Sequence, residues 1–141
     1  SNTGGAVLKK FFSDEELEQF SQKINLDKPT ELDYYPLLKS GERFPINNPK
    51  LLPKLEPIPD NKIEFLQGLL ESMAKIEALG YKKLQKLGAT PVSRVYTAGG
   101  GAKNKNWAKI RQYYLQVPVK ISDSTEAAYG TALLAKRSQN K

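Results

Sequence analysis

Residues 97–107, TAGGGAKNKNW, place three consecutive glycines between two segments of different periodicity. The preceding residues 93–97 are short, β-branched and aromatic, as in a strand, whereas the apolar residues of 107–115 recur at helical spacing. Because glycine lacks a Cβ, a ligand can approach its backbone closely, and the first amides of a helix can donate to phosphate oxygens. The pattern is typical of a nucleotide-binding turn.

Two common phosphate-binding motifs are excluded at this turn. A Walker A loop needs Gly-Lys-Ser/Thr at its end, and a dinucleotide fingerprint needs a third glycine where Asn104 stands. A nucleotide here is therefore held by another scheme. A plain crossover, whose glycines serve only tight packing, is the alternative interpretation.

The composition limits the chemistry of the chain. With 141 residues, 39% hydrophobic and 26% charged, it has the size and balance of one globular domain. We find no membrane span or signal peptide and expect a cytoplasmic protein. The absence of cysteine and histidine excludes disulfides, thiolate or histidine catalysis and Cys/His zinc sites in this chain, so a metal ion needs oxygen ligands.

The net charge of +7 does not by itself indicate a polyanionic partner. Lysines are spread along the chain among acidic residues, and the densest basic stretch, residues 103–111, belongs to the glycine turn and its helix. We therefore interpret the charge as a solvated surface and expect no nucleic-acid or membrane partner.

Helical signals mark the first part of the chain. Residues 5–12 predict a short helix, and Ser13 with Glu16 forms a capping box that begins a second one. The buried stripe of the second helix is Leu17, Phe20 and Ile24. Residues 27–60 hold most of the nine prolines and predict a long irregular connection, which is uncommon without a function or a neighbour to pack against.

The rest of the chain alternates helices with strands. Residues 61–87 predict the longest helix, residues 117–121 a second strand, and residues 125–136 a last helix capped by Ser124. The apolar stripe of the longest helix is Ile63, Leu66, Leu70, Met73, Ile76, Leu84 and Leu87. This alternation implies parallel strands joined by right-handed crossovers.

Two strands make a poor parallel sheet, so we expect further strands from sequence upstream of Ser1. The chain does not begin with methionine, and its only methionine is Met73. We therefore expect a piece of a longer protein.

Six blocks of residues carry a resemblance to a known family. In order they are residues 1–6 (SNTGGA), 35–45 (YPLLKSGERFP), a long helix with Glu71, 99–104 (GGGAKN), 118–119 (PV) and 126–132 (EAAYGTA). In this order and at these separations they resemble the C-terminal domain of the FGGY carbohydrate kinases over nearly the whole chain. The resemblance implies an α/β fold of the ribonuclease-H-like, actin-like ATPase type, truncated here at its N-terminal strands.

The resemblance also implies a division of labour between two domains. ATP is held mainly by the C-terminal domain, to which residues 1–141 correspond, and the sugar mainly by an N-terminal domain of the same chain that is absent here. The glycine turn of the family packs on adenosine, which implies Gly99, Gly100 and Gly101. An amide side chain shortly after the turn lies near adenine, which implies Asn104.

A second part of the implied ATP site comes from the first helix. The glycine that begins this helix in the family lies near the phosphates and matches Gly5, with Gly4 beside it. Lys9 falls one turn later, where a cation can approach phosphate; a solvated lysine is the alternative.

The chain also departs from the family pattern. Gln67, Gly68 and Ser72 surround Glu71 where the family carries Arg-Ala and Gly, which places the chain on a divergent branch. We expect structural roles for the charged residues of the blocks: Glu42, Arg43, Glu71 and Glu126, the last favoured by its helix dipole.

The expected activity is phosphoryl transfer from Mg-ATP to a sugar hydroxyl, which depends mainly on positioning and charge neutralisation. The phosphate-binding Asp-x-Gly-Thr and the catalytic aspartate of the family match nothing in this sequence, so we expect no catalytic residue here and no activity from this chain alone. The turn and the Gly-Glu-Arg-x-Pro loop look most like pentulose kinases, which favours D-xylulose or D-ribulose and leaves glycerol or another polyol open.

Two other functions remain open at this stage. The fold can serve a non-catalytic nucleotide-binding or regulatory module, and a nucleic-acid module would show a steep salt dependence of binding. A homodimer is also compatible with the sequence.

Overall fold

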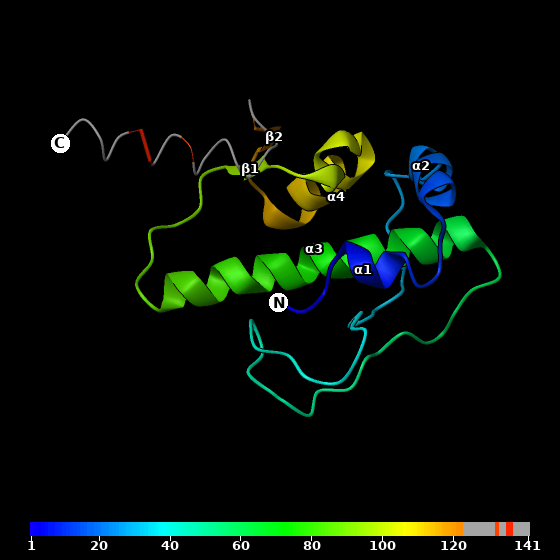
Figure 1. The fold of residues 1–141 in the computed structure, drawn as a ribbon, viewed down its shortest axis with the longest axis horizontal. Coiled ribbons are helices and arrows are strands. Elements are labelled where there is room, and N and C mark those ends of the chain that lie inside the picture. Colours follow the sequence, from blue (N-terminus) through cyan, green and yellow to red (C-terminus); the bar gives the residue numbers. More distant parts are fainter. Residues whose placement is uncertain (123–131, 133–134, 137–141) are drawn as a thin grey trace.

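The computed structural model describes residues 1–122, 132 and 135–136. Its elements are α1 (Gly5–Leu8), α2 (Asp14–Gln22), α3 (Lys62–Lys86), β1 (Val95–Thr97), the 3-10 turn η1 (Gly100–Lys103), α4 (Lys105–Leu115) and β2 (Val119–Ile121). Helix α3 runs through the middle of the molecule, with α4 and the strands on one side and the irregular connection on the other (Figure 1). The helix predicted over residues 125–136, its cap Ser124 and Glu126 lie outside the described residues, except for 132, 135 and 136.

The start of α2 follows the predicted capping box. Ser13 Oγ accepts a hydrogen bond from the amide of Glu16 at 3.1 Å, and the Glu16 carboxylate accepts one from the Ser13 amide at 2.9 Å. In the predicted stripe Ile24 is buried, whereas Leu17 and Phe20 are half-buried against the core. A local sequence signal thus sets this helix.

Helix α1 is shorter than predicted: it ends at Leu8, whereas the predicted helix spans residues 5–12. The chain turns there and carries Phe11 and Phe12 toward α3. The ring of Phe11 meets the ring of Phe65 edge to face at 5.2 Å, and Phe12 is buried. Aromatic packing against α3 therefore overrides continued helix.

Helix α3 spans the predicted residues and forms the centre of the core. Its N-cap is Asn61, whose Oδ1 accepts from the amides of Ile63 and Glu64. The buried core residues are Phe12, Ile24, Tyr34, Phe65, Leu66, Leu69, Leu70, Ala74 and Ile110. The prediction that Leu84 and Leu87 are buried is wrong, since their side chains are 41% and 81% exposed. The last turns of α3 extend beyond the elements that cover its middle.

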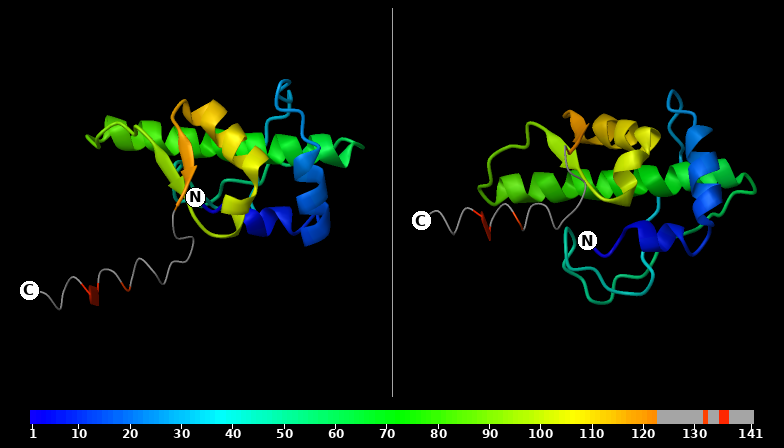
Figure 2. Two further views of the ribbon diagram at one scale, coloured as in Figure 1. Left: turned by 90° about the horizontal axis from the view of Figure 1, so that it is seen from above. Right: turned by 45° about the horizontal axis from the view of Figure 1, so that its top comes forward.

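The two strands pair in parallel, as predicted, with Val95 opposite Val119. Each is shorter than its predicted range, since only three residue pairs align. Tyr96 and its partner Lys120 are exposed, so one face of this small sheet is uncovered. Figure 2 shows the sheet beside α4.

The predicted irregular connection, residues 27–60, contains no helix or strand, and the irregular segment observed is slightly longer, residues 23–61. Two isolated antiparallel bridges, Tyr35 with Lys54 and Glu42 with Asn48, shape it. Within the described part of the chain, no helix is both long and apolar enough to cross a membrane.

Candidate nucleotide site

The glycine turn joins β1 to α4 through η1. Gly99 has φ +78°, a backbone conformation that L side chains rarely adopt, so glycine is needed there. A Cβ atom built at Gly99 or Gly100 would meet none of the described residues within 4 Å. The outer side of the turn is therefore open to a ligand.

The inner side of the turn rests on a tryptophan. A Cβ at Gly101 would lie 3.5 Å from Cδ1 and Nε1 of Trp107. The guanidinium of Arg111 lies over the indole ring at 5.6 Å from its centroid. Trp107 is thus held between the turn and Arg111.

Arg111 is the charged residue that sequence reasoning missed behind this turn. It is buried, and its Nε and Nη2 each donate to the Glu77 carboxylate of α3 at 2.7 Å. These hydrogen bonds raise the pKa of Arg111 against the opposing effect of burial. The pair crosses from α4 to α3, so no local pattern in either helix identifies it.

Asn104 fixes the start of α4. Its Oδ1 accepts from the amide of Trp107 at 2.9 Å as an N-cap, and its Nδ2 donates to Oγ of Ser21 at 2.9 Å. Nδ2 of Asn106 donates to the Ser21 carbonyl at 2.7 Å. Both halves of the Asn104 amide are therefore engaged within the protein, and the turn is tied to the last residues of α2. A contact between Asn104 and adenine remains a prediction.

The predicted phosphate-side residues lie on the N-terminal segment. A Cβ at Gly4 or Gly5 would also meet no atom within 4 Å in the part of the chain that the structure describes, so this backbone is open as well. The left view of Figure 2 shows α1 and η1 on the same side of α3. Lys9 is exposed and its Nζ lies 3.0 Å from Asp14 Oδ1, so this cation already has a partner. An exposed pair of this kind contributes little to stability.

Thr3, directly before these glycines, is a second residue that sequence reasoning missed. Its Oγ1 is buried and has no hydrogen-bond partner among the described residues. An unsatisfied buried hydroxyl is costly, which marks this position as unusual. Its place immediately before a Gly-Gly pair at a helix start is the one signal that the sequence offered.

Glu71 has the structural role predicted for it. It is buried and accepts from the Thr30 amide, from Thr30 Oγ1 at 2.8 Å and from Gln67 Nε2 at 2.8 Å. The departures from the family pattern take part: Oγ of Ser72 accepts from the Tyr34 amide at 3.0 Å. A Cβ at Gly68 would lie 2.8 Å from Leu32. These residues hold the irregular connection against α3.

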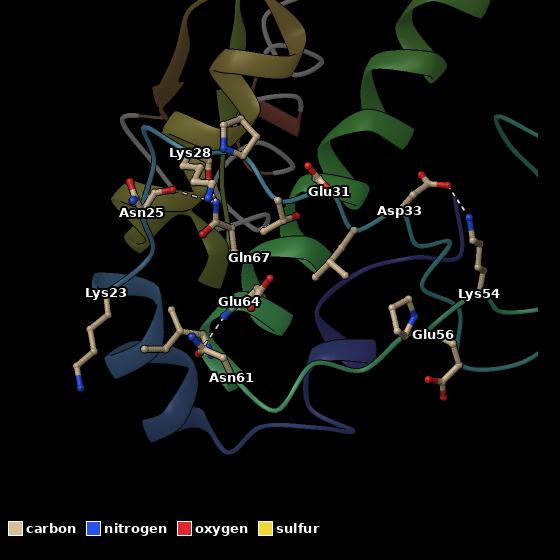
Figure 3. Close-up of a pocket in the computed structure, with 15 residues that line it drawn as sticks. Lys23, Asn25, Lys28, Glu31, Asp33, Lys54, Glu56, Asn61, Glu64 and Gln67 are labelled. Atoms are coloured by element: carbon tan, nitrogen blue, oxygen red, sulfur yellow. Dashed lines mark hydrogen bonds and ion pairs between the residues drawn. The ribbon is translucent and has the colours of Figure 1, made fainter.

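A groove of about 1000 Å³ lies elsewhere, between the end of α2, the start of α3 and the irregular connection (Figure 3). None of the predicted ATP residues lines it. Nε2 of Gln67 donates to the carbonyls of Asn25 and Lys28 at its wall, and Asp33 pairs with Lys54 at 2.6 Å. The groove is therefore separate from the predicted ATP site.

The described residues contain no candidate metal centre. Among the described residues, no group of three or more acidic side chains lies close enough together to hold a metal ion.

Comparison with known proteins identifies the family of the chain. Residues 3–138 match the family model described as the FGGY family of carbohydrate kinases, C-terminal domain. The chain therefore belongs to this family. The family implies an actin-like, ribonuclease-H-like ATPase fold, and the mixed helices and parallel strands are compatible with part of such a domain.

Similar curated proteins include the autoinducer-2 kinases of Yersinia pestis (strain Pestoides F) and Yersinia pseudotuberculosis serotype O:3 (strain YPIII). Each is 35% identical over 82 residues, which is 57% of this chain and 16% of the relative. The matched part of the chain thus spans about a sixth of these relatives.

Proposed function

We propose that this chain is the nucleotide-binding part of an ATP-dependent carbohydrate kinase. The observation that carries the proposal is the open glycine turn between β1 and α4, in a domain of the FGGY family. Gly99, Gly100 and Gly101 pack on the adenosine, and Asn104 lies near adenine at the base of the turn.

The phosphates are assigned to the N-terminal segment. Gly4 and Gly5 present bare backbone there, as their open surroundings allow. Lys9 lies one turn further and can reach phosphate only by leaving Asp14. Mg²⁺ belongs to the substrate Mg-ATP and would supply charge neutralisation at the transferred phosphoryl group.

The sugar-binding domain and the catalytic base belong to sequence upstream of Ser1. The uncovered face of the two-stranded sheet supports this, because parallel sheets are normally covered on both faces. The small share of the relatives that the chain matches supports it as well. We assign no catalytic residue to residues 1–141, and the chain alone is inactive.

The acceptor is a pentulose, D-xylulose or D-ribulose. The turn GGGAK and the loop GERFP support this choice by their likeness to pentulose kinases. Autoinducer-2 is the second acceptor to test, because the similar proteins are named as kinases of that compound.

The test is ADP release by the intact protein that carries this chain, with Mg-ATP and each acceptor in turn: D-xylulose, D-ribulose, L-ribulose, glycerol and autoinducer-2. Turnover with one acceptor and none from residues 1–141 alone is the expected result. ATP binding without turnover on any acceptor would favour a non-catalytic nucleotide-binding module. No ATP binding at all would overturn the proposal.

A further inference from the structure

Glu42 is the most completely buried carboxylate among the described residues, with 2% of its surface exposed. Four donors surround it: Ser1 Oγ at 2.5 Å, the Asn2 amide at 2.9 Å, the Arg43 amide at 2.9 Å and Tyr35 Oη at 3.1 Å. A buried charge is tolerated only when it is paired or hydrogen-bonded, and this one is fully hydrogen-bonded.

Two of these donors belong to the segment that leads directly to Gly4 and Gly5. A third link joins the same parts, because Nδ2 of Asn2 donates to the carbonyl of Gly41 at 3.0 Å. Residues 1–3 form no helix or strand. Their path into α1 is therefore set by bonds to Glu42 and Gly41, some 40 residues away along the chain.

The loop that carries Glu42 is itself fixed. Gly41 has φ +108°, and a Cβ there would lie 3.0 Å from the Pro49 carbonyl oxygen. Glu42 and Asn48 exchange two backbone hydrogen bonds of 2.9 Å. Glu42 thus presents its carboxylate to the N-terminal segment from a rigid turn.

We propose that Glu42 is a positioning residue, which holds Gly4 and Gly5 in register with the glycine turn so that one ATP molecule can contact both. The inference rests on the proposed ATP site. Glu42 is buried and does not touch the nucleotide; it acts through Ser1 and Asn2. The long irregular connection thereby gains a role in ATP binding.

The variant that tests this is Glu42→Gln in the intact protein, which keeps the shape of the side chain and removes its charge. Glu71→Gln is the matched control, because Glu71 is also a buried carboxylate that holds the irregular connection, through Thr30 and Gln67, without contacting residues 1–5. We expect the KM for ATP to rise about tenfold in Glu42→Gln, as the loss of a charged hydrogen bond allows. The KM for the sugar stays unchanged, and Glu71→Gln keeps the wild-type KM for ATP.

Ser1→Ala provides an independent variant if Glu42→Gln fails to fold. This variant removes the Ser1 hydroxyl, one of the two donors from the N-terminal segment, and leaves the Glu42 carboxylate with three hydrogen-bond donors. We expect a smaller rise of the KM for ATP, about threefold, again without change in the KM for the sugar.

The outcomes separate the two proposals. A wild-type protein that does not bind ATP would overturn the proposed function and this inference together. A wild-type protein that binds ATP, with Glu42→Gln and Glu71→Gln giving the same KM for ATP, would overturn the inference alone. If Glu42→Gln does not fold and Ser1→Ala does, an unchanged KM for ATP in Ser1→Ala would likewise overturn the inference alone.

Discussion

At the scale of single residues, Asn104 combines two tasks that mutation can separate. Its Oδ1 caps α4, and its Nδ2 reaches Ser21 and is proposed to lie near adenine. Serine is also a good N-cap but has no amide. Both Asn104→Ser and Asn104→Ala lose the bond to Ser21, but only alanine also loses the cap, so Asn104→Ser should be more stable than Asn104→Ala by about 1 kcal/mol.

Urea unfolding of the two variants measures the stability difference, and titration with ATP measures binding. Both variants should bind ATP more weakly than the wild type. Wild-type affinity in Asn104→Ser would contradict a role for this amide at adenine while leaving its role as a cap intact.

Glu42 also predicts a pH dependence of stability. Burial raises its pKa, but the hydrogen bonds from Ser1, Asn2, Arg43 and Tyr35 outweigh it and hold the pKa below the ordinary 4.5. A carboxyl group whose pKa is lowered by folding stabilises the fold at any pH above its pKa in the unfolded state. This contribution is lost as the pH falls through its pKa in the folded state.

The free energy of unfolding of the wild type should therefore fall on acidification below about pH 4.5, and that of Glu42→Gln should fall less steeply. Some acid sensitivity remains in the variant, because Lys54 lowers the pKa of Asp33 as well. Chemical unfolding at a series of pH values gives both slopes. Parallel slopes in the two proteins would contradict this account of Glu42.

At the scale of secondary structure, Gly68 in α3 shows how tertiary packing reverses a local preference. Alanine in a helix interior normally adds about 1 kcal/mol of stability over glycine. A Cβ at Gly68, however, would lie 2.8 and 2.9 Å from two side-chain carbons of Leu32 and 3.0 Å from the ring of Tyr34. Gly68→Ala should destabilise the fold by about 1–3 kcal/mol.

Gly80→Ala is the control within the same helix. The three atoms nearest to its Cβ all belong to the half-buried ring of Phe44, and only one of them is as close as 3.0 Å. Thermal unfolding should show a clearly smaller loss for Gly80→Ala than for Gly68→Ala. Equal or improved stability in Gly68→Ala would mean that Leu32 and Tyr34 move aside without cost.

Local sequence patterns predicted most helices and strands, and the errors come from contacts between residues far apart in the sequence. The capping box of Ser13 and Glu16 and the span of α3 could be predicted because neighbouring residues determine them, and the parallel pairing followed from the alternation of helices and strands. Burial of Leu84 and Leu87 could not, since it depends on how far the covering elements reach along α3.

The candidate site divides in the same way. The glycine turn is continuous in the sequence, so its residues were predicted from the pattern and the resemblance. The supports of the site join distant positions: Arg111 meets Glu77 across 34 residues, and Asn104 meets Ser21 across 83. Contacts between such separated residues leave no periodicity in one sequence.

At the scale of the whole molecule, the elements around α3 hold two backbone segments in place: the glycine turn and the N-terminal segment. Helices α2 and α4 hold the glycine turn through Ser21, Asn104 and Asn106. The irregular connection, in turn, holds the N-terminal segment through Glu42. Helices α2 and α4 both contact α3, and Gln67 and Glu71 of α3 hold the irregular connection, so α3 links the two sets of supports.

The tryptophan beneath the glycine turn gives this domain an optical reporter of its own. Trp107 is the single indole in the 141 residues, and it lies against Gly101 with Arg111 on its face. Selective excitation of tryptophan therefore reports on the turn without labelling. Addition of ATP to this chain should change the fluorescence emission of Trp107. Gly99→Val, which strains the turn, should abolish that change. If ATP binds but the emission spectrum stays the same, the nucleotide lies away from the turn.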